Sequence, residues 1–204
     1  ARYSTMTVTG SIAMQQAMRD KNLQSLTIVF PLAAVGVAAV LFIFHRTLKG
    51  LIIGFLPLGY ALMLTFGVLG TIQPELTLLS IAVAALLLGL GVDYSIYLAN
   101  RFAEEHEISD KITRVERTLG HTGKAVFLCA FTTIIGFGSL MTSYMPPMVT
   151  FGFGCAIGIM FTFISAIILV PCLCLILKFE KHETNHRWRR VAVFIVDYRK
   201  KLFA

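Results

Sequence analysis

The stretch LTLLSIAVAALLLGLGVDYSIYLAN, residues 76–100, determines the fold class of this chain. It is longer than the roughly 20 apolar residues that an α-helix needs to cross the hydrocarbon core of a membrane. The rest of the chain has a similar character, because 56% of its 204 residues are hydrophobic, 14% are charged and the mean hydropathy is +0.77. Soluble domains carry about 25% charged residues, so the sequence predicts an integral membrane protein.

Four further apolar segments surround this stretch, separated by gaps that contain proline or charged residues. The sequence therefore predicts an all-α membrane domain over residues 26–177, a bundle of five transmembrane helices with amphipathic cytoplasmic helices beside it. The predicted spans are 26–44, 51–72, 76–100, 125–144 and 149–177.

The regions outside these spans differ in composition. Residues 1–25 are predicted to be the last strand and short helix of an extracytoplasmic domain, and residues 178–204 a cytoplasmic amphipathic linker helix. Apolar residues at helical spacing within 101–124 predict a further amphipathic helix in that gap, and a solvated connector is the alternative. The chain begins with Ala, and we expect it to be a segment of something longer.

Basic residues predict the orientation. All 18 Lys and Arg except Arg2, Arg19 and Lys21 lie in gaps or tails on one side of the predicted membrane. The positive-inside rule then places the N-terminus outside and the C-terminus in the cytoplasm, with the protein in the cytoplasmic (inner) membrane. The net charge of +7 is explained by this topology, and nucleic-acid binding is not expected because no separate basic domain exists.

The four cysteines lie inside apolar segments, where a thiol usually acts as a small packing residue. No metal site is therefore expected. The motif GCAIG, residues 154–158, has small residues four apart and predicts close packing against another helix.

Asp93 is the only Asp, Glu, Lys, Arg or His within the five predicted spans. An ionised carboxylate at this depth costs roughly 2.5–3.5 kcal/mol, so we expect it to face protein or water. Because burial favours the neutral form, such an acid can gain and lose a proton. The alternative is a protonated Asp93 that holds a single helix–helix hydrogen bond.

The neighbours of Asp93 favour a functional role over a purely structural hydrogen bond. Gly89, Asp93 and Tyr97 are four residues apart and form one stripe along the helix. Gly89 would let another helix approach, and Tyr97 continues a polar line. Tyr94, the next residue around the helix, could donate its hydroxyl to a carboxylate on a facing helix.

Two threonines on the following span lie at nearly the same predicted depth as Asp93. Thr132 and Thr133 together with Asp93 suggest a short proton wire, and Gly136 and Gly138 would permit close helix contact. The alternative for either threonine is a hydrogen bond to its own helix.

Four segments resemble, in order and spacing, the resistance–nodulation–division (RND) superfamily and in particular its MMPL-type, hydrophobe/amphiphile-exporter branch. They are GLGVDYSIYLANRFAEE (89–105), FTTIIGFGSL (131–140) and PPMVTFGFGCAIGI (146–159), with LVPCLCLI (169–176) after them. The resemblance implies helices two to six of one half of a transporter, a block that also occurs in sterol-sensing domains. It also implies that Asp93 and Tyr94 relay protons coupled to export of lipids or other amphiphiles.

Under this resemblance the protons are the coupling ion and no cofactor is needed. The implied partners are a hydrophobic substrate, membrane lipids and a second half of the transporter with a matching acidic site. The alternative to a second half in the same protein is a half-size transporter that acts as a homo-oligomer, which would still need a first helix and a porter domain.

Other functions were weighed against this one. An intramembrane aspartyl protease needs a second membrane Asp to share a proton and activate water, and no other predicted span contains one, so an enzyme is not expected. A passive channel is disfavoured because one acid makes a poor pore. A lipid- or sterol-sensing module without proton flux stays open, and it would tolerate Asp93→Asn.

Overall fold

The computed structural model describes residues 28, 31–39, 41–42, 47–72, 78–105, 108 and 110–177. Every regular element in these residues is a helix. Four helical segments in them are long and apolar enough to cross a membrane: Leu48–Ile72, Ala82–Glu104, Lys111–Thr142 and Pro146–Ile176. The prediction of an all-α integral membrane protein is therefore confirmed.

The first predicted span is described in part, and its residues 31–39 and 41–42 are helical. Leu41 from this helix is fully buried against Leu58 of α2 (Leu48–Ile72). The strand and helix predicted within 1–25 and the amphipathic helix predicted at 178–204 lie outside the described residues.

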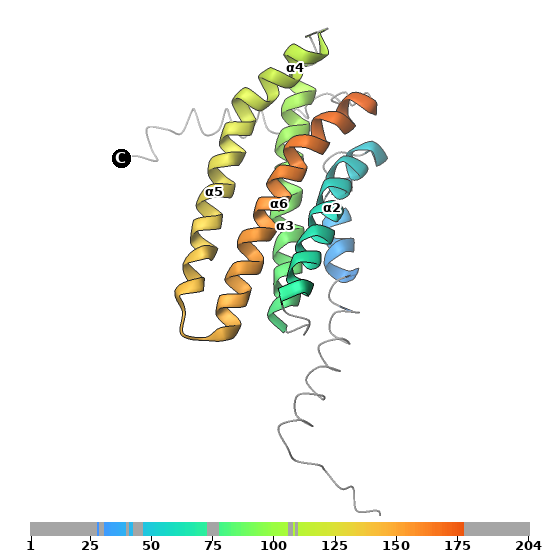
Figure 1. The fold of residues 1–204 in the computed structure, drawn as a ribbon. Coiled ribbons are helices and arrows are strands. Elements are labelled where there is room, and N and C mark those ends of the chain that lie inside the picture. The colour runs from blue at the N-terminus through green and yellow to red at the C-terminus, as the bar shows by residue number, and fades with distance from the viewer. Residues whose placement is uncertain are drawn as a thin grey trace, which may run out of the picture.

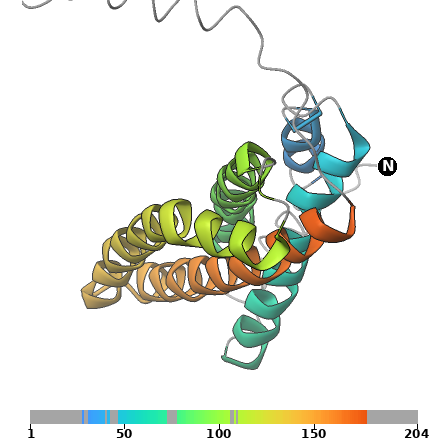
Figure 2. The ribbon, with the colours of Figure 1, turned by 90° about the horizontal axis from the view of Figure 1, so that it is seen from above.

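Helix α6 (Pro146–Ile176) is the central element of the bundle. It packs against α2, α3 (Leu78–Glu104) and α5 (Lys124–Ser139). Figure 1 shows α6 with α5 on one side, α2 on the other and α3 behind it, and Figure 2 shows the same helices from above. The GCAIG motif lies in this interface. A Cβ on Gly154 would lie 3.3 Å from Leu69 and from Val83, and one on Gly158 would collide with Leu87. The predicted packing role of the motif is thus confirmed.

A hydrogen bond also joins α6 to α2. The hydroxyl of Ser165, buried in α6, donates to the carbonyl of Pro57 at 2.7 Å. Pro57 lies inside α2, and because its nitrogen carries no hydrogen, it interrupts the backbone hydrogen bonds of that helix. The serine therefore binds the backbone of α2 at its proline.

The chain from Lys111 to Thr142 is helical throughout, so the predicted amphipathic helix and the fourth predicted span form one path. It consists of α4 (Lys111–Thr118), a π-helical turn η2 (Leu119–Gly123), α5 and a short 3₁₀ turn η3 (Leu140–Thr142). Asp110 begins α4 as its N-cap, since its carboxylate accepts the backbone N–H of Thr113 at 3.0 Å. A hairpin then joins α5 to α6, which begins at Pro146.

Candidate functional site

Asp93 lies on the outward face of α3. It is exposed, as are Gly89 one turn before it and Tyr97 one turn after it, whose side chain is 61% exposed. The predicted stripe therefore exists, and it faces away from the helices described here. Asp93 forms no hydrogen bond or ion pair with the described residues. An acid in this position needs water or another protein surface to cover it.

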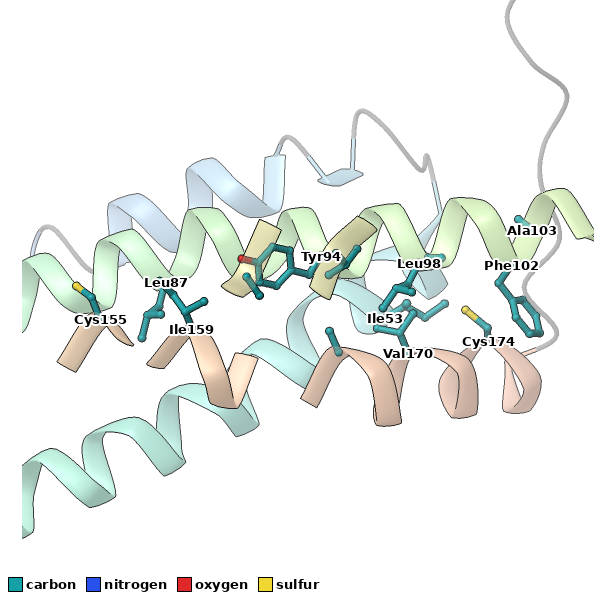
Figure 3. Close-up of a cluster of buried hydrophobic side chains, with 14 of the residues drawn as sticks. Ile53, Leu87, Tyr94, Leu98, Phe102, Ala103, Cys155, Ile159, Val170 and Cys174 are labelled. Carbon is teal, nitrogen blue, oxygen red and sulfur yellow. The ribbon is translucent and has the colours of Figure 1, made fainter. Parts of the chain in front are cut away.

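Tyr94 lies on a different face of α3 and points into the bundle. A step of one residue turns the side chain by about 100° around the helix, and Tyr94 is only 2% exposed. It belongs to the main buried cluster, in which Leu87 and Leu98 lie on the same helix before and after it (Figure 3). The Tyr94 hydroxyl lies close to Thr133 and Cys129 of α5.

The Tyr94 hydroxyl makes no hydrogen bond of good geometry with any described residue, although it is completely buried. A buried hydroxyl without a partner costs about 1–3 kcal/mol. The nearest polar groups, on Thr133 and Cys129, are both on α5, so a small movement of α5 against α3 would make or break a hydrogen bond.

The two threonines are bonded to their own helix. Thr133 donates its hydroxyl to the Cys129 carbonyl at 2.6 Å, and Thr132 donates to the carbonyls of Leu128 and Cys129, each at 3.0 Å. This donation occupies the hydroxyl hydrogen but leaves the oxygen free to accept. The Thr133 oxygen can therefore receive the Tyr94 hydroxyl, whereas Thr132 is exposed on an adjacent side of α5.

Of the four predicted relay residues, the structure thus brings Tyr94 and Thr133 together. Asp93 is next to Tyr94 in the chain but faces outward. Sequence reasoning missed Cys129, which was interpreted as a packing residue. Its spacing gave a usable signal, because Cys129 precedes Thr133 by four residues and so shares its helix face.

The predicted packing glycines do not pack within this bundle. A Cβ built on Gly89, Gly136 or Gly138 would meet no described atom within 4 Å. Gly91 and Gly152 approach other helices instead: a Cβ on Gly91 would lie 2.6 Å from a methyl of Leu58. Helical spacing predicts which residues share a face, but it does not say which face meets a neighbour.

The outer surface of α5 is apolar and lies beside this site. Phe127, Leu128, Phe131 and Ile135 are each at least half exposed. In the candidate span Lys111–Thr142, 11% of an 18-residue apolar stretch is buried inside the described bundle. This helix therefore offers most of its surface to lipid or to another protein segment.

The fold and the site define a multi-pass membrane protein with one acid on an outward helix face. The sequence model of the MMPL family matches residues 2–200, and the chain belongs to that family. The resemblance inferred from the sequence motifs is therefore confirmed.

Individual relatives come from archaea and bacteria. The chain is 31% identical over 169 residues to the putative membrane protein MJ1562 of Methanocaldococcus jannaschii. The matched residues make up 82% of this chain and 44% of that protein. The chain is 24% identical over 191 residues to the probable transport protein MmpL1 of Mycobacterium tuberculosis, covering 88% of this chain and 20% of that one. For the probable transport protein MmpL12 of the same species the identity is 23% over 203 residues, with coverage of 94% and 18%.

The chain thus spans less than half the length of these relatives. No solved structure matches it.

Proposed function

We propose that this chain is the membrane segment of an exporter that uses the proton-motive force to move lipids or other hydrophobic or amphiphilic compounds, with Asp93 as the proton carrier. Two relatives named as probable transport proteins support a role in transport. The observation that carries the proton-relay role is the placement of Asp93, exposed within the apolar part of a transmembrane helix and with no partner among the described residues.

The outward placement of Asp93 argues for a second protein surface. Burying a charge in lipid is costly, so intramembrane acids face protein or water-filled cavities. We propose that a second transporter half with its own acidic site covers the stripe of Gly89, Asp93 and Tyr97. The absence of a side chain at Gly89, with nothing described within 4 Å of a Cβ there, would allow that close approach. Gly136 and Gly138 on α5 would do the same.

The proposed proton path needs no cofactor. The Asp93 carboxylate takes up a proton from one side of the membrane and becomes neutral, and its release to the other side restores the carboxylate. Tyr94 would extend the path into the bundle, because its buried hydroxyl can donate to Thr133. Thr132, exposed beside Thr133, would face the path from outside the bundle.

The orientation of the protein is part of the proposal. The end of the bundle at which α3 meets α4 carries Arg101, Lys111, Arg114 and Arg117. The positive-inside rule would place this end in the cytoplasm and the N-terminus outside.

The test is Asp93→Asn in the full-length protein, with substrate export and proton uptake measured together. Asparagine keeps the shape of the side chain but cannot carry a proton, so we expect both activities to be lost. Asp110→Asn is the matched control, because it makes the same change at a cap where asparagine serves equally well. Undiminished export by Asp93→Asn would refute the relay. Lipid binding without proton uptake, in the unmodified protein as well, would instead indicate a lipid-sensing module.

A further inference from the structure

The end of α3 is held by a side chain from α4. Arg114 donates to the carbonyl of Phe102 from Nε at 3.0 Å and from Nη2 at 2.8 Å. Its guanidinium carbon also lies 4.0 Å from the centroid of the Phe102 ring. The last four carbonyls of a helix lack partners in that helix and carry partial negative charge, so this contact satisfies α3 and attaches α4 to it.

The same arginine is held firmly in its own helix. Its backbone N–H donates to the Asp110 carbonyl at 3.0 Å, and its carbonyl accepts the hydroxyl of the fully buried Thr118 at 2.8 Å. Arg114 therefore fastens α4 to the C-terminal end of α3.

Continuous helices connect this attachment point to both Tyr94 and Thr133. Tyr94 and Phe102 lie on α3, and the eight-residue step between them corresponds to about 12 Å at 1.5 Å per residue. From Arg114 to Thr133 the chain is helical through α4, η2 and α5. Holding Arg114 on Phe102 would therefore constrain the height of Thr133 relative to Tyr94.

A hydrogen bond between Tyr94 and Thr133 requires a precise position of α5 along α3. Hydroxyl hydrogen bonds span about 2.5–3.0 Å between oxygens, whereas a slip of α5 by a single residue is about 1.5 Å. A slip of that size would remove Thr133 from reach of the Tyr94 hydroxyl. The bidentate contact suits this task, because a guanidinium fork restricts orientation and a lysine ammonium does not.

We propose that Arg114 is a positioning residue for the Tyr94 site: by fastening α4 to the carbonyl of Phe102, it fixes the register of α5 against α3 and keeps Tyr94 level with Cys129 and Thr133. Its effect on transport rests on the proposed proton relay. The register of α5 against α3 is a structural property, and it can be measured without a transport assay.

The register is tested by cross-linking in the full-length protein. Tyr94→Cys is paired with the native Cys129, the other cysteines are replaced by serine, and a bis-methanethiosulfonate with about the reach of a tyrosine side chain joins the two thiols. We expect Arg114→Gln to lower the cross-linking yield severalfold and Arg114→Lys to lower it less. Arg117→Gln is the matched control, because it removes the same charge from an exposed position of α4. Equal yields in all four proteins would overturn the proposal.

The functional effect is tested by a double-mutant cycle on proton uptake. If Arg114 acts through Tyr94, then Arg114→Gln slows uptake in the parent protein and adds nothing in a Tyr94→Phe background. Independent, additive losses would overturn the positioning role. Failure of the proton relay itself has a different signature: uptake would survive Asp93→Asn, while the cross-linking yields would still depend on Arg114.

Discussion

The hairpin between α5 and α6 depends on a glycine, and replacing it with alanine should destabilise the bundle. A Cβ on Gly152 would lie 2.6 Å from the carbonyl oxygen of Phe137, 2.9 Å from the Cβ of Leu140 and 3.4 Å from the backbone nitrogen of Met141. Two of these atoms are backbone and the third is fixed to it, so none can rotate away. Gly152→Ala must therefore push the end of α5 off α6.

The expected change in the free energy of unfolding for Gly152→Ala follows from two opposing effects. Overfilling a packed interior costs about 1–3 kcal/mol, and the upper part of this range applies here because the backbone has to move. Replacing glycine by alanine inside a helix returns roughly 0.5–1 kcal/mol. The free energy of unfolding should therefore fall by about 1–2 kcal/mol.

Gly67→Ala provides the control. Gly67 is exposed inside α2, and a Cβ there meets no described atom within 4 Å, so only the helix-forming gain remains. Unfolding of this chain in detergent micelles, titrated with sodium dodecyl sulfate and followed by far-ultraviolet circular dichroism, measures both variants. The two changes should have opposite signs. If Gly152→Ala is as stable as Gly67→Ala, the close approach of α5 to α6 is refuted.

Two further predictions concern single hydrogen bonds. Ser165→Ala should lower the free energy of unfolding in the same micelle assay by about 0.5–1.5 kcal/mol, because it removes the hydrogen bond to Pro57. Ser139→Ala is the control and should change the free energy of unfolding little, because this exposed serine bonds within its own helix. Equal effects of the two substitutions would contradict the interhelical hydrogen bond. Hydrogen bonds from the side chain and backbone of Thr113 lower the pKa of Asp110 below its ordinary 3.8. The cap therefore stabilises α4 fully above pH 3.8, and this contribution is lost as the pH falls through the lower, folded-state pKa. As the pH falls through this pKa, amide hydrogen exchange in α4 should become faster in the parent protein than in Asp110→Asn. Parallel pH profiles of the two proteins would show that the Asp110 carboxylate does not stabilise α4.

Much of the fold was predictable because a membrane leaves few choices. A backbone in lipid must satisfy its own hydrogen bonds, so long apolar segments become helices. The described part of the chain accordingly contains four helical segments long and apolar enough to cross a membrane. The same reasoning singled out Asp93, since a lone acid in an apolar helix is conspicuous from composition alone.

The direction in which each face points was not predictable. The stripe of Gly89, Asp93 and Tyr97 was recognised, but whether it faced the bundle or the outside depended on which helices packed against α3. Gly91, two residues after Gly89, has the close contact that was assigned to Gly89. Such contacts depend on pairs of residues distant in sequence, and periodicity within one helix contains no information about them.

The sequence by itself determined that this is an α-helical membrane protein of the MMPL family, and that Asp93 is the one acid in the five spans predicted from it. Only the tertiary structure decided that Asp93 faces outward while Tyr94 turns inward to α5. It also revealed Cys129 beside the tyrosine, and Arg114 on the end of α3. A π-helical turn contributes to this arrangement, because the wider turn at Leu119–Gly123 rotates every later residue of α5 relative to an unbroken α-helix. That rotation depends on how the segment packs against its neighbours, and its effect appears only when the helices are assembled.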